Sequence, residues 1–271
     1  MYKMLVLDLD GTLTNSKKQL SKRTKERLIG AMEEGMLITL ASGRSLKGII
    51  HIADEIGMQE RGGYIIAFNG SLVIELGSGK HLKEEFMDRK YYPEILALSR
   101  EYEVDLLTYG REQKNLLTNN SSNPYAKLDA MINRMELIEE RDMQAALDYP
   151  VPKFLFLGEA KRMERIEAEL KQRIGEKLEV CRSEPYFLEI MPKGIDKGNA
   201  LESLCESIGI PISRTIAFGD GYNDLGMIKT AGLGVAMENA VPRIKEAAGY
   251  ITSSNDEDGV AKALDRLLGK E

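Results

Sequence analysis

The chain has 271 residues, 43% of them hydrophobic and 30% charged, with a net charge of −6 at neutral pH. That length suffices for one large domain or two modest ones. The acidic balance argues against nucleic acid as a partner, because affinity for nucleic acid comes mostly from neutralising phosphates with basic side chains. No apolar stretch approaches the ~20 residues of a transmembrane helix, and no secretory signal is visible, so we expect a cytoplasmic protein without a membrane partner.

Cysteine and histidine are scarce. Cys181 and Cys205 lack the spacing of a metal-binding pair and are expected to be free, packed thiols. His51 and His81 are too few for a histidine-based zinc site. Any metal is therefore expected to be a hard cation held by oxygen atoms.

A short apolar strand is predicted over residues 3–7, and it ends in Asp8-Leu9-Asp10-Gly11-Thr12. Two carboxylates at the end of a buried strand are costly unless positive charge lies beside them. Alternate residues of a strand face the same way, so Asp8 and Asp10 can approach one centre if the strand stays regular. A cation there would suit phosphate chemistry. The alternative is a turn with two solvated carboxylates.

The next segments alternate between helix and strand. Residues 21–34, which Ser21 can cap, and 46–56 are predicted helices, and 36–40 and 64–68 are predicted strands. This order predicts an α/β fold with a doubly wound parallel sheet of the Rossmann-like kind, whose sites lie beyond the carboxyl ends of the strands. Asp8, Ser42 and Asn69 all fall at such ends.

Ser42-Gly43-Arg44 follows the second predicted strand. The hydroxyl of Ser42 and the backbone N–H groups near Gly43 suit an anion. The alternative is an ordinary helix start, with Arg44 in solvent.

The pattern changes after a predicted hairpin around Gly77-Ser78-Gly79. No strand of the next hundred or so residues ends in a carboxylate or a glycine-rich turn, so we expect an inserted α+β domain with an antiparallel or mixed sheet. The expected domains are 1–84 and 191–271, which form the core, and 85–190, which is inserted. Within the insertion, strands are predicted at 104–108, 115–118, 153–157, 178–181 and 186–190, and helices at 91–102, 124–134 and 160–174.

The first pattern then returns. Asp196 can cap a helix that ends near 208, strands follow at 215–218, 233–236 and 249–251, and helices start at Val241 and near 257. Lys197 and Gly198 both weaken the first turn of their helix, which points to a compensating anion or carboxylate nearby. Asp220, Asn223 and Asp224 lie in a strand-to-helix turn, where Asp220 is the natural metal ligand on a second strand.

In that order, these segments resemble the haloacid dehalogenase-like hydrolases. The long spacing between Ser42-Gly43 and Lys197 is similar to the Cof-like subgroup, which carries a large cap domain there and includes bacterial sugar-phosphate phosphatases. Other segments resemble that subgroup too, namely Asn69-Gly70, Tyr186 to Ile190, Gly234 to Ala240 and Asn255 to Ala261.

The resemblance implies a Mg²⁺-dependent hydrolase of small phosphomonoesters, with sugar phosphates as the expected substrates. Asp8 would form an aspartyl-phosphate, and Asp10 would protonate the leaving alkoxide and then activate water. Mg²⁺ would be held by Asp8, the backbone carbonyl of Asp10, and Asp220, with Asp224 behind them. The phosphoryl group would be held by backbone N–H groups around Leu9 and by Ser42, Gly43, Lys197 and Asn223.

The charges fit these roles in principle. Mg²⁺ and Lys197 would lower the pKa of Asp8, whereas Asp10, farther from the metal, would keep a raised pKa and act as an acid. Two alternatives stay open, a phosphomutase-like transferase and a non-catalytic sugar-phosphate sensor. The sequence does not name the substrate, and a monomer or a weak homodimer is expected.

Overall fold

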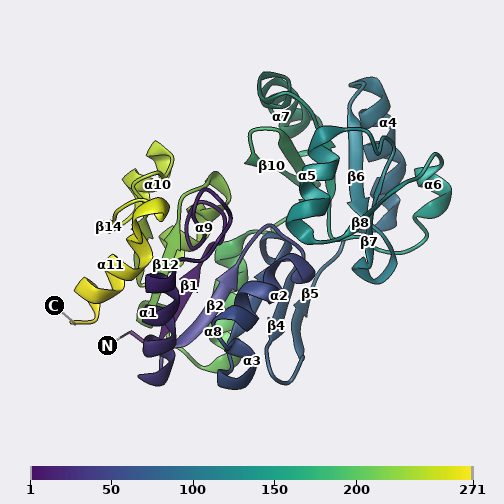
Figure 1. Cartoon of the computed structure of the whole chain (residues 1–271). Helices are drawn as coiled ribbons and strands as arrows, with labels where there is room; N and C mark the ends of the chain where they lie inside the picture. Colours follow the sequence, from purple (N-terminus) through teal and green to yellow (C-terminus); the bar gives the residue numbers. More distant parts are fainter. Residues whose placement is uncertain (1, 270–271) are drawn as a thin grey trace. The chain divides into compact units, whose positions relative to one another are not determined.

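The computed structural model describes residues 2–269. The chain divides into two compact units: the core unit, made of residues up to Glu84 and from Asp196 onward, and the inserted unit, Glu85–Ile195 (Figure 1). The sequence placed the second boundary at 190/191. The inserted unit extends farther because β11, Phe187–Pro192, pairs with strands of that unit.

The described residues of the core unit form a sheet of eight strands in the order β14-β13-β12-β1-β2-β3-β4-β5. The strands from β14 to β3 are parallel, and β3, β4 and β5 form an antiparallel edge. Their bounds are β1 Met4–Leu7, β2 Leu37–Ala41, β3 Tyr64–Ala67, β4 Leu72–Glu75, β5 His81–Glu84, β12 Thr215–Gly219, β13 Leu233–Ala236 and β14 Tyr250–Ile251. The prediction of a doubly wound α/β core is confirmed.

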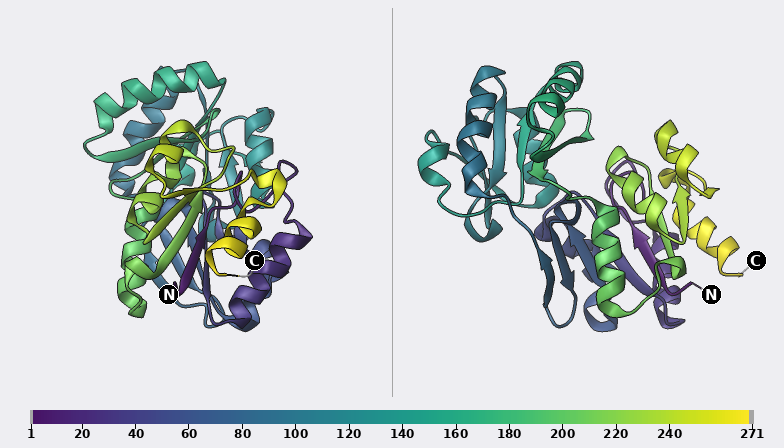
Figure 2. Two further views of the ribbon diagram at one scale, coloured as in Figure 1. Left: turned by 90° about the vertical axis from the view of Figure 1, so that its left-hand side faces the viewer. Right: turned by 180° about the vertical axis from the view of Figure 1, so that it is seen from behind.

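Helices lie along both halves of the core chain. Figure 2, right, shows α8 in green beside the strands of this sheet. Ser21 accepts a hydrogen bond from the N–H of Thr24 at the start of α1, as predicted, and Asp196 accepts one from the N–H of Asn199 at the start of α8. The helices are α1 Lys22–Glu33, α2 Leu46–Glu55, α3 Met58–Arg61, α8 Lys197–Ile208, α9 Leu225–Thr230, α10 Pro242–Ala247 and α11 Gly259–Leu267.

The register of the central strands decides where the site forms. All four residues of β1 are buried, which accounts for the apolar run at the start of the chain. Leu7 at the end of β1 pairs with Phe218 in β12 and with Leu40 in β2. The residues that follow these three strands therefore reach the same edge of the sheet.

The described residues of the inserted unit form a six-stranded sheet in the order β10-β11-β9-β6-β7-β8, antiparallel except for the pair β7 and β8. The sequence analysis missed β8 and α6, which are short. The elements are β6 Asp105–Tyr109, β7 Asn115–Thr118, β8 Glu136–Glu139, β9 Phe154–Leu157, β10 Leu178–Glu184, α4 Tyr92–Glu101, α5 Pro124–Asn133, α6 Met143–Ala146 and α7 Ala160–Ile174.

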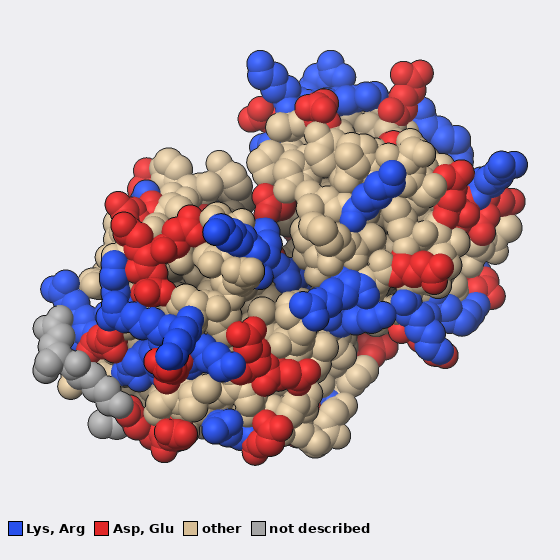
Figure 3. Space-filling view, in the orientation of Figure 1, with Lys and Arg blue, Asp and Glu red and all other residues tan. Residues whose placement is uncertain are grey.

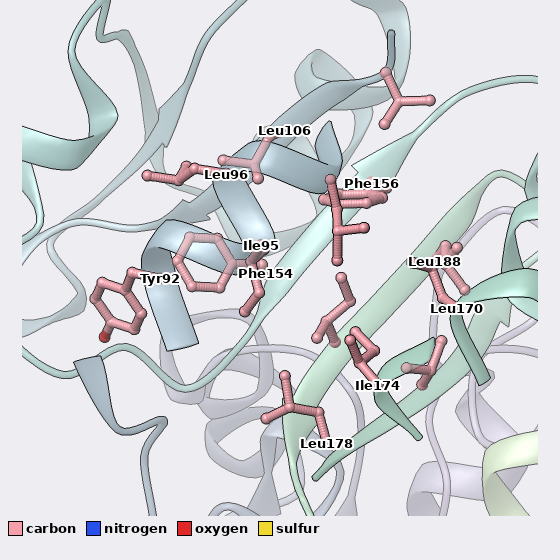
Figure 4. Close-up of a cluster of buried hydrophobic side chains, with 14 of the residues drawn as sticks. Tyr92, Ile95, Leu96, Leu106, Phe154, Phe156, Leu170, Ile174, Leu178 and Leu188 are labelled. Atoms are coloured by element: carbon pink, nitrogen blue, oxygen red, sulfur yellow. The ribbon is translucent and has the colours of Figure 1, made fainter. Parts of the chain in front are cut away.

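One face of this sheet packs against α4 and α7. Figure 4 shows Ile95 and Leu96 of α4, together with Leu170 and Ile174 of α7, among side chains of β6, β9, β10 and β11. The ring of Tyr92 meets that of Phe154 edge to face, with centroids 5.1 Å apart. The inserted unit thus has a hydrophobic core of its own.

A buried ion pair lies in the inserted unit. Lys153 Nζ is 2.7 Å from Glu189 Oε1, and both side chains are at most 3% exposed. Ser183 donates a second hydrogen bond to the same carboxylate oxygen. Removing one partner of a buried pair is far more costly than removing one partner of a surface pair.

We therefore expect Lys153→Met to lower the free energy of unfolding by about 3–5 kcal/mol, because the Glu189 carboxylate stays buried without its ammonium. Urea unfolding followed by circular dichroism measures this. Lys171→Met is the matched control, since Lys171 also lies 2.7 Å from a glutamate, Glu167, but is half exposed; its loss should be about 1 kcal/mol or less. Equal losses in the two variants would contradict the prediction.

On the face shown in Figure 3, Lys and Arg side chains lie among Asp and Glu side chains. Some oppositely charged side chains form ion pairs on the protein surface, such as Arg173 with Glu101 and Lys90 with Asp88.

Across residues 2–269, no helix has the length and apolar character needed to cross a bilayer.

Candidate active site

A buried lysine joins two carboxylates at the carboxyl edge of the core sheet. Lys197 begins α8, and its Nζ donates hydrogen bonds to Oδ1 of Asp8 and to Oδ1 of Asp224, each 2.6 Å long. The Lys197 side chain is 0% exposed. These two carboxylates supply the negative charge that was predicted to compensate for a lysine in the first turn of α8.

The turn after β12 is held by one of these carboxylates. Oδ2 of Asp224 accepts hydrogen bonds from the backbone N–H groups of Asp220, at 3.0 Å, and Gly221, at 2.9 Å. Thr12, in the loop after β1, donates a 2.7 Å hydrogen bond from Oγ1 to Oδ1 of Asp220. Asp224 therefore fixes the turn, and Thr12 orients the Asp220 carboxylate.

Asp8, Asp220 and Asp224 form the acidic group that could bind a cation. Each offers one carboxylate oxygen, and these oxygens lie within 4.8 Å of one another. The three carboxylates carry more negative charge than Lys197 neutralises. An all-oxygen, negatively charged donor set fits a hard divalent cation such as Mg²⁺.

The pKa of Asp8 reflects the same excess of negative charge over positive charge. Burial raises it most, Asp224 raises it further, Lys197 lowers it and Asp220 raises it again, so the pKa lies well above its ordinary value. Lys197 lowers the pKa of Asp8 as expected, but among the side chains alone its effect is outweighed by burial and by the neighbouring carboxylates. For Lys197, burial acts to lower the pKa, but Asp224 and Asp8 outweigh burial and the pKa is raised.

Asp10 lies outside this acidic group as the described residues define it, and its side chain is bound by cations instead. Arg44 donates from Nε to Oδ2, at 2.7 Å, and from Nη2 to Oδ1, at 2.6 Å, while Lys18 Nζ lies 2.6 Å from Oδ1. Burial acts to raise the pKa of Asp10, but the hydrogen bonds and charge of Arg44 and Lys18 lower it to about 2. The expectation of a raised pKa is therefore wrong.

Arg44 and Lys18 are the functional candidates that sequence reasoning missed. The Arg44 side chain is only 7% exposed, and it also donates to the carbonyl of Gly48. The alternative that Arg44 lies in solvent is wrong. Arg44 could have been predicted from its position after β2, because this is the edge of the sheet at which Asp10 also lies. Lys18 lies in a loop, and nothing in the sequence pointed to it.

The expected phosphate-binding residues lie around the same edge. The Ser42 hydroxyl accepts a 3.2 Å hydrogen bond from the N–H of Arg44, and the Leu9 carbonyl accepts one of 2.9 Å from the N–H of Thr14. Asn223, in the 3-10 turn η5 (Tyr222–Asp224), donates from Nδ2 to Oδ1 of Asn69, at 3.0 Å. The structure thus brings Asp8, Ser42, Lys197, Asp220 and Asn223 to one end of the sheet.

Two asparagines from the C-terminal part of the chain stabilise the loop after β1. Asn239 donates from Nδ2 to the carbonyl of Gly11, at 2.7 Å, and Asn255 donates from Nδ2 to the carbonyl of Thr14, at 2.9 Å. The N–H of Asn255 in turn donates to Oδ1 of Asn239. The C-terminal segments therefore support the loop that carries Asp10 and Thr12.

Comparison with known proteins decides the family. Residues 5–264 match the family model of the haloacid dehalogenase-like hydrolases. The chain belongs to that family. The prediction of the family, and of an enzyme within it, is confirmed.

Relatives and solved structures agree along almost the whole chain. Phosphatase YwpJ of Bacillus subtilis is 31% identical over 98% of this chain and 100% of its own length. The 5-amino-6-(5-phospho-D-ribitylamino)uracil phosphatase YcsE of the same organism is 30% identical over 97% of this chain and 94% of its own length. The crystal structure of a haloacid dehalogenase-like hydrolase from Bacteroides thetaiotaomicron is similar with a TM-score of 0.90, at 45% identity, over 98% of this chain and 100% of that one.

Proposed function

We propose that the protein is a Mg²⁺-dependent phosphatase that hydrolyses small phosphomonoesters, sugar phosphates above all, through an aspartyl-phosphate on Asp8. The observation that carries this proposal is the buried lysine between Asp8 and Asp224, with the carboxylate of Asp220 beside them. Such a site needs a further cation and offers a carboxylate nucleophile beside it. Relatives named as phosphatases support the same reaction.

In the proposed reaction, Asp8 would attack phosphorus. Its carboxylate is held by Lys197, whose ammonium also supplies positive charge where the equatorial oxygens of the transferring group gain negative charge. Asp8, Asp220 and the backbone carbonyl of Asp10 would hold Mg²⁺, which when bound reduces the repulsion between the attacking carboxylate and the phosphate dianion. Asp224 keeps the Asp220 turn and Lys197 in place.

Asp10 would protonate the leaving alkoxide and later accept a proton from the attacking water. With a pKa of about 2, it is a carboxylate in the contacts described, and a carboxylate can take a proton from water. To donate a proton to the leaving alkoxide, it must first release Arg44 and Lys18 and take up a proton from water. Arg44 and Lys18 would therefore hold Asp10 between catalytic steps.

The substrate class draws support from one relative. YcsE, by its name, acts on a uracil derivative whose phosphate is carried by a ribityl chain. A phosphate on a polyol or sugar is therefore the substrate we favour for this chain. That the inserted unit selects the substrate stays a prediction, and so does the monomeric or weakly dimeric state.

Phosphate release from a generic aryl phosphate tests the proposed function. We expect the purified protein to release phosphate in Mg²⁺, to stop when a chelator is added in excess, and to resume when Mg²⁺ is restored. The reason is that Lys197 alone does not balance the carboxylates around the nucleophile. Circular dichroism in chelator serves as the control for folding. An unchanged rate in chelator, with the protein folded, would rule out the metal.

A further inference from the structure

We infer that Asn69 is a positioning residue for the phosphoryl site, acting through Asn223 and through the loop of Ser42 and Gly43. The inference rests on the proposed function, because it takes these segments as the phosphate-binding ones. Asn69 lies in the 3-10 turn η1, Phe68–Gly70, which follows β3. It is buried, with 2% of its surface exposed.

The backbone of this turn is strained. Phe68 has φ of 51° and Asn69 has φ of 57°, so two consecutive residues other than glycine adopt the left-handed region. Asparagine tolerates that region, but a bulky aromatic residue rarely occupies it. Strain of roughly 1–3 kcal/mol per residue persists only where the surrounding contacts over-determine the conformation. The turn is therefore held in place by its neighbours.

Those neighbours belong to the loop after β2. The N–H of Asn69 donates to the carbonyl of Ser42, and the N–H of Phe68 donates to the carbonyl of Arg44, each at 3.0 Å. The amide of Asn69 also packs directly on Gly43, where a Cβ would lie only 3.1 Å from Oδ1 of Asn69. Left-handed backbone and side-chain amide thus act together on the Ser42–Gly43 loop.

The same side chain reaches a third segment. Oδ1 of Asn69 accepts the 3.0 Å hydrogen bond from Nδ2 of Asn223, which lies 154 residues later in the chain. On the other side, a Cβ at Gly70 would lie 2.7 Å from the carbonyl of Asp196, at the start of the helix that carries Lys197. The turn therefore touches each of the segments that we assign to the phosphoryl group outside the β1 loop.

Asn69→Gly separates the side chain from the backbone, since glycine accepts the left-handed conformation and only the amide is lost. We expect kcat/KM for an aryl phosphate to fall about 10- to 100-fold, because a small displacement of the groups that position a substrate lowers the reaction rate by factors of this size. Arg134→Gly is the matched control. Arg134 is an exposed residue with φ of 53° at the end of α5, so its replacement should leave kcat/KM unchanged.

A double-mutant cycle with Asn223→Ala then tests whether Asn69 acts through Asn223. If it does, the combined loss in the double variant should be clearly smaller than the product of the two single losses, whereas independent roles would make the two losses multiply. The inhibition constant of inorganic phosphate should rise in Asn69→Gly as well, which a loss of overall stability alone would not produce. A wild-type kcat/KM in Asn69→Gly, or multiplying losses, would overturn the inference.

A second readout keeps this test apart from that of the proposed function. Inorganic phosphate with Mg²⁺ should raise the thermal midpoint of the wild type, by binding only the folded protein, and this rise should shrink in Asn69→Gly but not in Arg134→Gly. If the wild type releases no phosphate from any ester, the proposed function fails. An equal rise in all three proteins would show that Asn69 does not position the phosphate site.

Discussion

Asp8→Asn is expected to reduce phosphate release by roughly 10⁴-fold or more, since removing the nucleophile of a hydrolase costs losses of this order. The amide keeps the shape of the carboxyl group and retains an oxygen toward Lys197, but it does not attack phosphorus. Steady-state hydrolysis of an aryl phosphate at saturating Mg²⁺ measures the loss.

The same substitution should leave the fold intact. Folding raises the pKa of Asp8, so at neutral pH the ionised carboxylate costs stability relative to a neutral group. Asp8→Asn should therefore keep or raise the midpoint of thermal unfolding. Asp54→Asn, at an exposed position, is the control and should change neither activity nor midpoint. Full activity in Asp8→Asn would show that another group attacks phosphorus.

Lys197→Met should lower kcat/KM by about 10²–10³-fold, the usual cost of removing one group that stabilises charge in a transition state. The ammonium is the one cationic side chain that the described residues place between Asp8 and Asp224. Methionine fills similar volume without the charge, so the loss reports the charge itself. Hydrolysis is measured at saturating and limiting substrate, to separate kcat from kcat/KM.

Stability must be followed in parallel, because the substitution leaves two buried carboxylates without their ammonium. The assay temperature is therefore set below the unfolding midpoint of the variant, as measured by circular dichroism. Lys229→Met, at an exposed position in α9, should match the wild type. Equal kcat/KM in Lys197→Met and the wild type, with both folded, would remove Lys197 from the proposed site.

The edge of the sheet could be predicted because it follows from apolar runs and their breaks. Strands β1, β2 and β12 are short and mostly buried, and a polar residue directly follows each of them. Parallel pairing then brings Asp8, Ser42 and Asp220 together whatever their distance in sequence. Predicted strand ends thus carried most of the information on the candidate site.

The direction of Asp10 could not be predicted in this way. The argument that Asp8 and Asp10 face one centre requires extended backbone through Leu9, but the chain turns there, and the Leu9 carbonyl accepts hydrogen bonds from Thr12 and Thr14. Asp10 therefore meets Arg44 and Lys18 instead. A period of two residues holds only as long as the strand does.

Helix α8 shows how one signal can have two causes. Lys197 is explained by the carboxylates it binds, as the cost of a cation at a helix start indicated. Gly198 has a different reason, because a Cβ there would lie 2.6 Å from the backbone of Gly226 in α9. The sequence shows that a glycine weakens a helix, but not which neighbour requires it. The Lys153–Glu189 ion pair could not be predicted from the sequence for the same reason, because only tertiary packing brings the two side chains together and buries them.

Trapping the phosphorylated enzyme tests most directly whether Asp8 captures phosphorus. The protein is mixed with an aryl phosphate in Mg²⁺ or in chelator, quenched with acid during turnover, digested and mapped by mass spectrometry. We expect one phosphoryl group on the peptide that contains Asp8, labile to hydroxylamine, present in Mg²⁺ and missing in chelator and in Asp8→Asn. A phosphoryl group on any other residue during turnover would contradict the proposed mechanism.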